Sequence, residues 1–132
     1  MNQIRVEYIG DLRTESVHLD SNNKIITDAP KDNQGLGRKF SPTDLVASAL
    51  GSCLLTIMGI VANRKQIDMT GCYAEVEKNM SENPRRISSI NIDIYLSDNI
   101  SNKDKDILCK ASKHCPVHNS LNKDINIKIN FN

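Results

Sequence analysis

Cysteines are the residues of this 132-residue chain whose type and setting are best suited to covalent chemistry. Cys53 lies in ALGSCLLT, the middle of the most apolar stretch, and Cys115 lies in HCPVHNSL, directly before a proline. A thiolate can attack an electrophile or exchange with a disulfide, whereas a cysteine buried among apolar residues is usually inert. Composition alone favours a core position for Cys53. Cys72 and Cys109 are most simply core or half-buried residues.

A metal site is a second kind of chemistry that these cysteines could support. His114, Cys115 and His118, with Cys109 one or two turns earlier, supply four potential ligands. No Cys-x-x-Cys pair accompanies them, so their spacing matches no familiar zinc finger. We therefore expect no metal site and no cofactor.

The overall composition excludes several classes of function. Lysine and arginine number 17 against 16 aspartate and glutamate, aromatic residues make up 4% and tryptophan is absent. No block of like charge and no stacking platform is present, so we expect no binding to nucleic acid. Hydrophobic residues make up 39% of the chain, which is typical of a soluble globular protein.

Residues 45–62 form the only stretch that is long and apolar enough to be considered as a membrane span. Hydroxyl residues, glycines and alanines weaken its hydrophobicity, so a helix buried in protein is the better interpretation. The N-terminal residues MNQIRVEYIG lack the apolar core of a signal peptide. We expect a cytoplasmic protein, where cysteines stay reduced and structural disulfides are rare.

Hydrophobic periodicity predicts an α+β fold with antiparallel sheet in a single domain, residues 1–132. One face of the stretch 87–97 carries isoleucines and a leucine almost without a break. The last strand alternates in the same way. Strands are expected at 3–8, 13–19, 24–27, 71–78, 87–97 and 124–131, and helices at 41–65 and from Ser101 to about Cys115. Tyr73 and Phe40 are expected in the core.

The helix at 41–65 has a clear start, because Ser41 can cap it, Pro42 suits its first position and Asp44 completes a capping box. The helix is apolar all round, and one small sheet cannot cover it. Small residues a turn apart, among them Ser48 and Gly51, would allow another helix to approach closely. A second copy of the same helix is the simplest partner, so the sequence indicates an intertwined homodimer.

The segments SPTDLVASALGSCLLTIMGI and CPVHNSL resemble the OsmC and organic hydroperoxide resistance superfamily, in its OsmC-like branch. The resemblance covers nearly the whole chain, including DLRTESVHLDSN and AEVEKNMSENPRRI. It implies an obligate dimer whose antiparallel sheets wrap around long central helices. It also implies thiol-dependent reduction of organic hydroperoxides, with Cys53 as the peroxidatic and Cys115 as the resolving cysteine.

That chemistry uses both thiols, because a sulfenic acid formed on one condenses with the other to a disulfide. A dithiol must reopen the disulfide, and a lipoylated protein does so for the organic hydroperoxide resistance members of the family. Leu54, Ile57 and Met58 could line an apolar pocket beside Cys53. Apolar surroundings raise a thiol's pKa, so a fixed cation is required. The resemblance assigns that role to Arg13, and Arg38 is a rival.

One departure from the family pattern concerns the start of the long helix. The organic hydroperoxide resistance branch has Asn-Pro-Glu there, its glutamate orienting the arginine, whereas this chain has Ser41-Pro42-Thr43 and its carboxylate at Asp44. A capping box also explains Asp44 fully. Asp44 lies ~13.5 Å from Cys53 along a straight helix, so we expect any help to that thiol to come from the other subunit. The departure leaves a second function open: a non-catalytic dimeric stress-response or small-ligand-binding protein.

Overall fold

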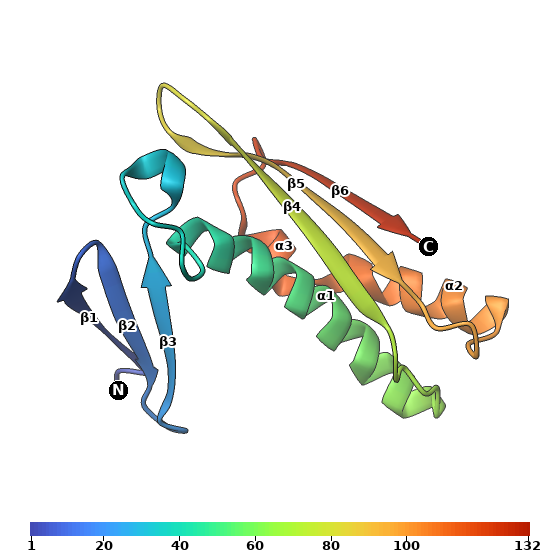
Figure 1. The fold of residues 1–132 in the computed structure, drawn as a ribbon. Helices are drawn as coiled ribbons and strands as arrows, with labels where there is room; N and C mark the ends of the chain where they lie inside the picture. The colour runs from blue at the N-terminus through green and yellow to red at the C-terminus, as the bar shows by residue number, and fades with distance from the viewer. The chain divides into compact units, whose positions relative to one another are not determined.

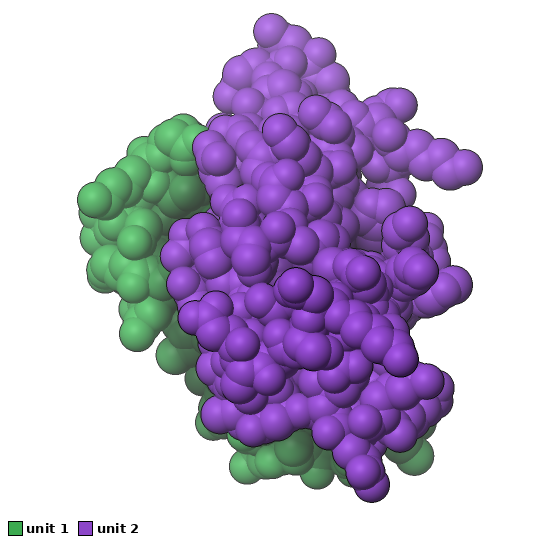
Figure 2. Space-filling model, turned by 90° about the vertical axis from the view of Figure 1, so that its right-hand side faces the viewer, with its two compact units in different colours: residues 1–46 green, residues 47–132 purple.

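The computed structural model describes residues 1–132 and divides them into two compact units, residues 1–46 and residues 47–132. Figure 2 draws the first unit in green and the second in purple. Each unit has a three-stranded sheet of its own (Figure 1), with the orders β1-β2-β3 and β4-β5-β6. The fold is α+β, as predicted.

The first unit is an antiparallel meander of β1 (Ile4–Gly10), β2 (Arg13–His18) and β3 (Asn23–Asp28). Gly10, Asp11 and Leu12 all have positive φ, which turns the chain sharply between the first two strands. A 3₁₀ turn, η1 (Lys31–Asn33), follows β3. The predicted strands are confirmed to within two residues.

The two faces of this sheet differ in chemistry. Direct partners in the register share a face, so Val6, Ser16 and Ile25 lie on one side, with Ile4 and Tyr8 next to Val6. The opposite side carries the ion pairs Arg5–Glu7 and Lys24–Glu15. The apolar side is as exposed as the charged one, because the side chains of Ile4, Val6, Tyr8 and Ile25 are all about half exposed or more.

The helix α1 (Pro42–Lys65) begins as predicted. The Ser41 hydroxyl accepts the N–H of Asp44 at 3.1 Å, and the Asp44 carboxylate accepts the N–H of Ser41 at 2.9 Å. This capping box satisfies two otherwise unpaired backbone donors. The buried face of the helix is formed by Ala47, Leu50, Gly51, Leu54, Met58 and Ala62.

By length and composition alone, α1 could cross a membrane, since its mean hydropathy reaches 2.2 over 18 residues. One such helix is weak evidence, because the core helix of a soluble protein has the same length and composition. Only 33% of this stretch is buried, and Leu50, Leu54 and Met58 are its fully buried part that packs in the core.

The sheet of the second unit has β5 (Arg86–Tyr95) between β4 (Tyr73–Ser81) and β6 (Asn126–Phe131). Five apolar side chains of β5 and its end are buried, namely Ile87, Ile90, Ile92, Ile94 and Leu96. The register against β4 shifts between Asn79 and Met80. This bulge inserts one residue, which is why Ile87 and Ile90 share a face although they are three positions apart.

Two features of the second unit differ from the expectation. First, β6 runs parallel to β5, whereas the sequence predicted antiparallel sheet throughout. A helical crossover between two strands returns the chain to the same end of the sheet, and strands so joined are parallel. Second, the expected helix from Ser101 to about Cys115 is α-helical only as far as Ala111. It consists of α2 (Asn102–Ala111) and η2 (Ser112–His114), and Pro116 opens a new helix, α3 (Pro116–Ser120).

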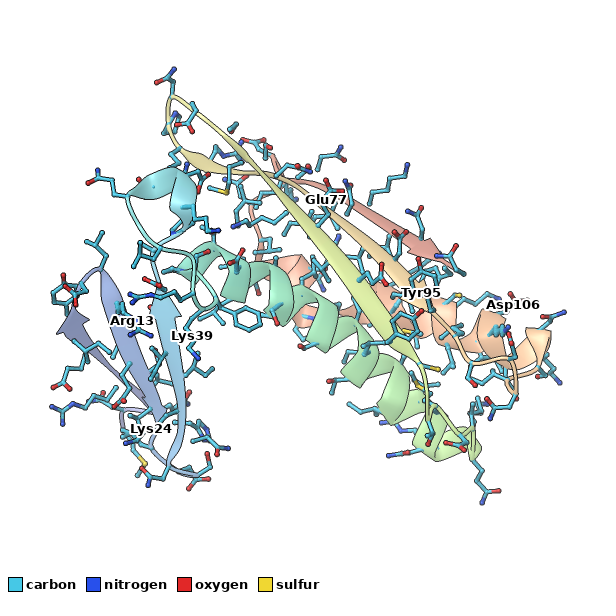
Figure 3. All side chains as sticks on the ribbon, in the orientation of Figure 1. Arg13, Lys24, Lys39, Glu77, Tyr95 and Asp106 are labelled. Carbon is cyan, nitrogen blue, oxygen red and sulfur yellow. The ribbon has the colours of Figure 1, made fainter.

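Phe40 and Tyr73 are exposed, so their predicted core positions are wrong. Tyr73 instead stacks on Tyr95, labelled in Figure 3, with ring centroids 4.8 Å apart. The two tyrosines are register partners at the ends of β4 and β5. Cross-strand pairing places their rings on one face, where stacking stabilises them without full burial.

Two glycines of α1, Gly51 and Gly59, should respond differently to replacement by alanine. An added Cβ at Gly51 would lie 3.0 Å from Cγ2 of Val76 on β4, whereas nothing lies within 4 Å of one at Gly59. Alanine stabilises a helix interior over glycine by about 1 kcal/mol where space allows. We expect Gly59→Ala to raise the free energy of unfolding by about that amount in urea titrations. Gly51→Ala should show no gain, and an equal gain for both would contradict the close approach of Gly51 to Val76.

Candidate active site

Cys53 lies in the middle of α1, one position after Ser52 and one before Leu54. Its side chain is half-buried, between the exposed Ser52 and the fully buried Leu54. Helical geometry therefore places the thiol at the margin of the buried face. Cys53 belongs neither to the core nor to open solvent.

Cys115 is fully buried, at the junction between η2 and α3. Its backbone is extended, and its sulfur caps α3 by accepting the N–H of His118 at 3.4 Å. Pro116 occupies the first position of α3, where its missing N–H costs nothing. The sequence Cys-Pro-Val-His thus fixes the sulfur through the backbone that follows it.

The structure brings the Cys53 and Cys115 thiols together within the second unit. Burial raises the pKa of Cys115, and a hydrogen bond with the Cys53 side chain raises it further. The N–H groups of His118 and Val117 act in the opposite direction. Cys115 is therefore a protonated thiol at neutral pH, held against the more exposed Cys53. Both cysteines are free in this state, and a disulfide between them would join α1 to the crossover after β5.

Only part of the predicted apolar lining beside Cys53 is exposed to a ligand. Leu54 and Met58 are fully buried and belong to the core, so they leave no surface for a ligand. Of the three residues named from the sequence, Ile57 alone is half-buried. Positions three and four residues apart share a helix surface, which places Ile57 next to Cys53.

Cys72 and Cys109 are half-buried and lie outside this pair. Cys72 directly precedes β4, and its sulfur accepts the N–H of Ser97 at 3.3 Å. Burial raises the pKa of Cys109, as does the negative charge of Asp106, labelled in Figure 3. A raised pKa keeps a thiol protonated and unreactive.

Arg13 and Arg38 both lie in the first unit, and both act on the carboxylate of Asp28. Arg13, labelled in Figure 3, opens β2 and is the direct register partner of Asp28 on β3. Arg38 donates to Oδ2 of Asp28 twice, from its backbone N–H at 3.0 Å and from Nε at 2.7 Å. The sequence around Asp28 does not distinguish this residue, because an aspartate that ends a strand before Ala29-Pro30 is a common turn residue.

Asp44 has the role that the capping box predicted, since its carboxylate binds the backbone of Ser41. Thr43 lies beside it, with its hydroxyl 3.3 Å from that of Ser41. The start of α1 is therefore held by hydroxyl and carboxylate contacts to its own first turn.

Comparison with known proteins decides the family. The sequence profile of the family described as OsmC-like protein matches residues 34–130, which include α1 with Cys53 and the crossover with Cys115. The chain belongs to the OsmC-like family. No curated protein matches the sequence.

Solved structures agree with this assignment. A protein from Psychrobacter arcticus is 48% identical, with a TM-score of 0.94, covering 100% of this chain and 96% of that chain. Its description, an osmotic stress induced and detoxification response protein, is itself provisional. An OsmC-like protein from Mycoplasma pneumoniae is 23% identical, with a TM-score of 0.80, covering 98% of this chain and 94% of that one. An organic hydroperoxide resistance protein from Legionella pneumophila is 17% identical, with a TM-score of 0.75, covering 97% and 93%. The last two show a shared fold.

Proposed function

We propose that this OsmC-like protein is a thiol-dependent peroxidase that reduces organic hydroperoxides. The Cys53 thiolate attacks the terminal oxygen of the hydroperoxide, the O–O bond breaks, and the organic part leaves as an alcohol after taking a proton. Cys53 is left as a sulfenic acid. The Cys115 sulfur then attacks it, a disulfide forms and water leaves.

The observation that carries this proposal is the pairing of two thiols that lie far apart in the sequence. The Cys115 sulfur caps α3, and this holds the thiol in contact with Cys53. The raised pKa of Cys115 keeps its thiol protonated until a base accepts the proton. A resolving thiol needs this arrangement, because it must wait beside the peroxidatic cysteine without competing for the peroxide.

The oxidised enzyme returns to its starting state through a dithiol reductant. Two electrons from the dithiol reduce the Cys53–Cys115 disulfide and leave the reductant as a disulfide of its own. We propose a lipoylated protein as that reductant, following the family. We also propose a cytoplasmic homodimer of single-domain subunits, in which Arg13 is the cation that stabilises the Cys53 thiolate. Any help from the Asp44 carboxylate comes from the other subunit.

An organic hydroperoxide should be consumed faster than hydrogen peroxide. Cys53 and Ile57 offer a half-buried, apolar margin, which favours a substrate with a hydrocarbon group. The measurement is peroxide consumption with cumene hydroperoxide or hydrogen peroxide, using dihydrolipoamide and, separately, dithiothreitol. We expect kcat/KM to be at least about tenfold higher for cumene hydroperoxide, which corresponds to about 1.4 kcal/mol of transition-state binding.

A preference for hydrogen peroxide would contradict the proposed substrate class. Failure to consume either peroxide with either reductant would remove the enzymatic function and leave the dimeric, non-catalytic protein as the better description.

A further inference from the structure

A buried carboxylate, that of Asp28, lies near two of the three arginines of the first unit, Arg13 and Arg38. Asp28 is fully buried at the end of β3, and its Oδ2 accepts both hydrogen bonds from Arg38. These bonds, and to a lesser extent the positive charge of Arg13, lower the pKa of Asp28. The side chain is therefore an anion at neutral pH, and a buried anion requires partners for both of its oxygens.

The second oxygen of Asp28 and one nitrogen of Arg13 are both buried and have no hydrogen-bond partner. The oxygen is Oδ1 of Asp28 and the nitrogen is Nε of Arg13. The two residues are direct partners across β2 and β3, so their side chains leave neighbouring strands on the same face. A negatively charged acceptor, Oδ1 of Asp28, and a positively charged donor, Nε of Arg13, thus lie on neighbouring strands, and neither has a hydrogen-bond partner.

The backbone around Asp28 holds the carboxylate firmly in this position. Its N–H donates to the carbonyl of Phe40 at 3.1 Å, and the next N–H, of Ala29, donates to Leu12. Gly35 packs directly over Ala29, where an added Cβ would lie 1.8 Å from the carbonyl oxygen. The loop that carries Arg38 is thereby folded back onto the end of β3, and Asp28 has little freedom to move.

We propose that Asp28 is the positioning residue for Arg13, with Oδ1 as the acceptor that receives the Nε–H of the guanidinium. One oxygen of Asp28 is committed to Arg38, which anchors the carboxylate, and the other orients Arg13. The two nitrogens at the end of the guanidinium stay available for a second anion. This inference rests on the proposed role of Arg13 as the cation that stabilises the Cys53 thiolate.

The test follows the thiol of Cys53 rather than turnover. Iodoacetamide alkylation of Cys53 is measured against pH in the intact four-cysteine protein, with the modified peptide quantified by mass spectrometry. Arg13→Met should raise the pH midpoint of Cys53 alkylation by about one unit. At a pH below the midpoint, this means about tenfold less thiolate than in the wild type. Asp28→Asn, which keeps the size of the side chain, should raise the midpoint in the same direction. The midpoint of the double variant should be no higher than that of Arg13→Met alone.

Arg5→Met is the matched control, because it removes an exposed guanidinium from the same sheet. Its midpoint should stay close to wild type. A shift as large as that of Asp28→Asn would show that any loss of charge from the sheet moves the midpoint, and the inference would be wrong. A shift for Arg13→Met without one for Asp28→Asn would also overturn it while leaving the proposed function intact. No shift for either would overturn both this inference and the proposed role of Arg13.

A second measurement covers the case in which Asp28→Asn does not fold. In the wild-type protein labelled with ¹⁵N, the arginine Nε–H groups are observed by NMR, and the Arg13 signal is the one lost in Arg13→Lys. A proton held by Asp28 should exchange with water at least about tenfold more slowly than that of the exposed Arg5. Exchange as fast as that of Arg5 would overturn the contact.

Discussion

Replacing Cys53 by serine should reduce hydroperoxide consumption to the background rate, because serine has no thiolate to attack the O–O bond. Cys115→Ser should behave differently. It should form one equivalent of sulfenic acid on Cys53 and then stop, since no neighbouring thiol remains to form the disulfide. Trapping with dimedone followed by mass spectrometry measures the sulfenic acid, and a non-reducing gel of the wild type measures the disulfide.

The other two cysteines supply matched controls for this prediction. Cys109 is kept protonated by burial, and Cys72 is bonded to the backbone of Ser97, so neither has a place in the proposed cycle. Cys72→Ser and Cys109→Ser should keep turnover within about a factor of two, the range of ordinary surface changes. Full activity of Cys53→Ser, or its loss in Cys109→Ser, would mean that a different thiol reacts with the peroxide.

The chain should sediment as a dimer of twice 14.7 kDa, and a single charge on the sheet of the first unit should break that dimer. The apolar face of β1 to β3 is uncovered, with the Val6 side chain 61% exposed. Apolar patches of this kind on soluble proteins mark interaction sites. A carboxylate at such a site costs several kcal/mol when it is buried without a partner. Val6→Asp should therefore raise the dissociation constant at least about 100-fold.

Arg5→Asp provides the control for this second prediction, because it places the same side chain at the neighbouring position on the charged face. Arg5 already faces solvent in its ion pair with Glu7, so its replacement should leave the dimer unchanged. Analytical ultracentrifugation across micromolar concentrations separates the two outcomes. A folded wild-type monomer at those concentrations, or an equal effect of the two variants, would be incompatible with an interface on the apolar face.

Local signals made much of the fold predictable. The capping residues Ser41, Pro42 and Asp44 identified the start of α1, because caps depend on a few neighbouring residues alone. Strand alternation located β5 and its buried isoleucines in the same way. The parallel pairing of β6 could not be obtained from its own sequence, since alternation is identical for parallel and antiparallel neighbours. It depends on how the crossover through α2 and α3 returns the chain.

The candidate site was also predictable only in part, since some of its contacts depend on tertiary structure. Cys53 and Cys115 stand out by their surroundings and by family resemblance, and the structure places them in contact. The carboxylate beside the arginines was sought at Asp44, because the family pattern has an acid near the start of the helix. The carboxylate that binds an arginine in the structure is Asp28, which accepts hydrogen bonds from Arg38 on a folded loop and is the register partner of Arg13. Contacts of this kind depend on tertiary structure, and no spacing rule predicts them.

The position of Cys115 in the crossover between β5 and β6 has a consequence for the protein during its synthesis. A ribosome releases α1 and Cys53 well before it releases the crossover, and β6 is the last strand to emerge. Until then, the Cys115 thiol is missing, which the proposed cycle needs to convert a Cys53 sulfenic acid into a disulfide. Sulfenic acid without such a partner is open to further oxidation to sulfinic acid, which thiols do not reverse. If Cys53 reacts with peroxide as proposed, a chain still being made should therefore be inactivated by peroxide that the finished protein survives.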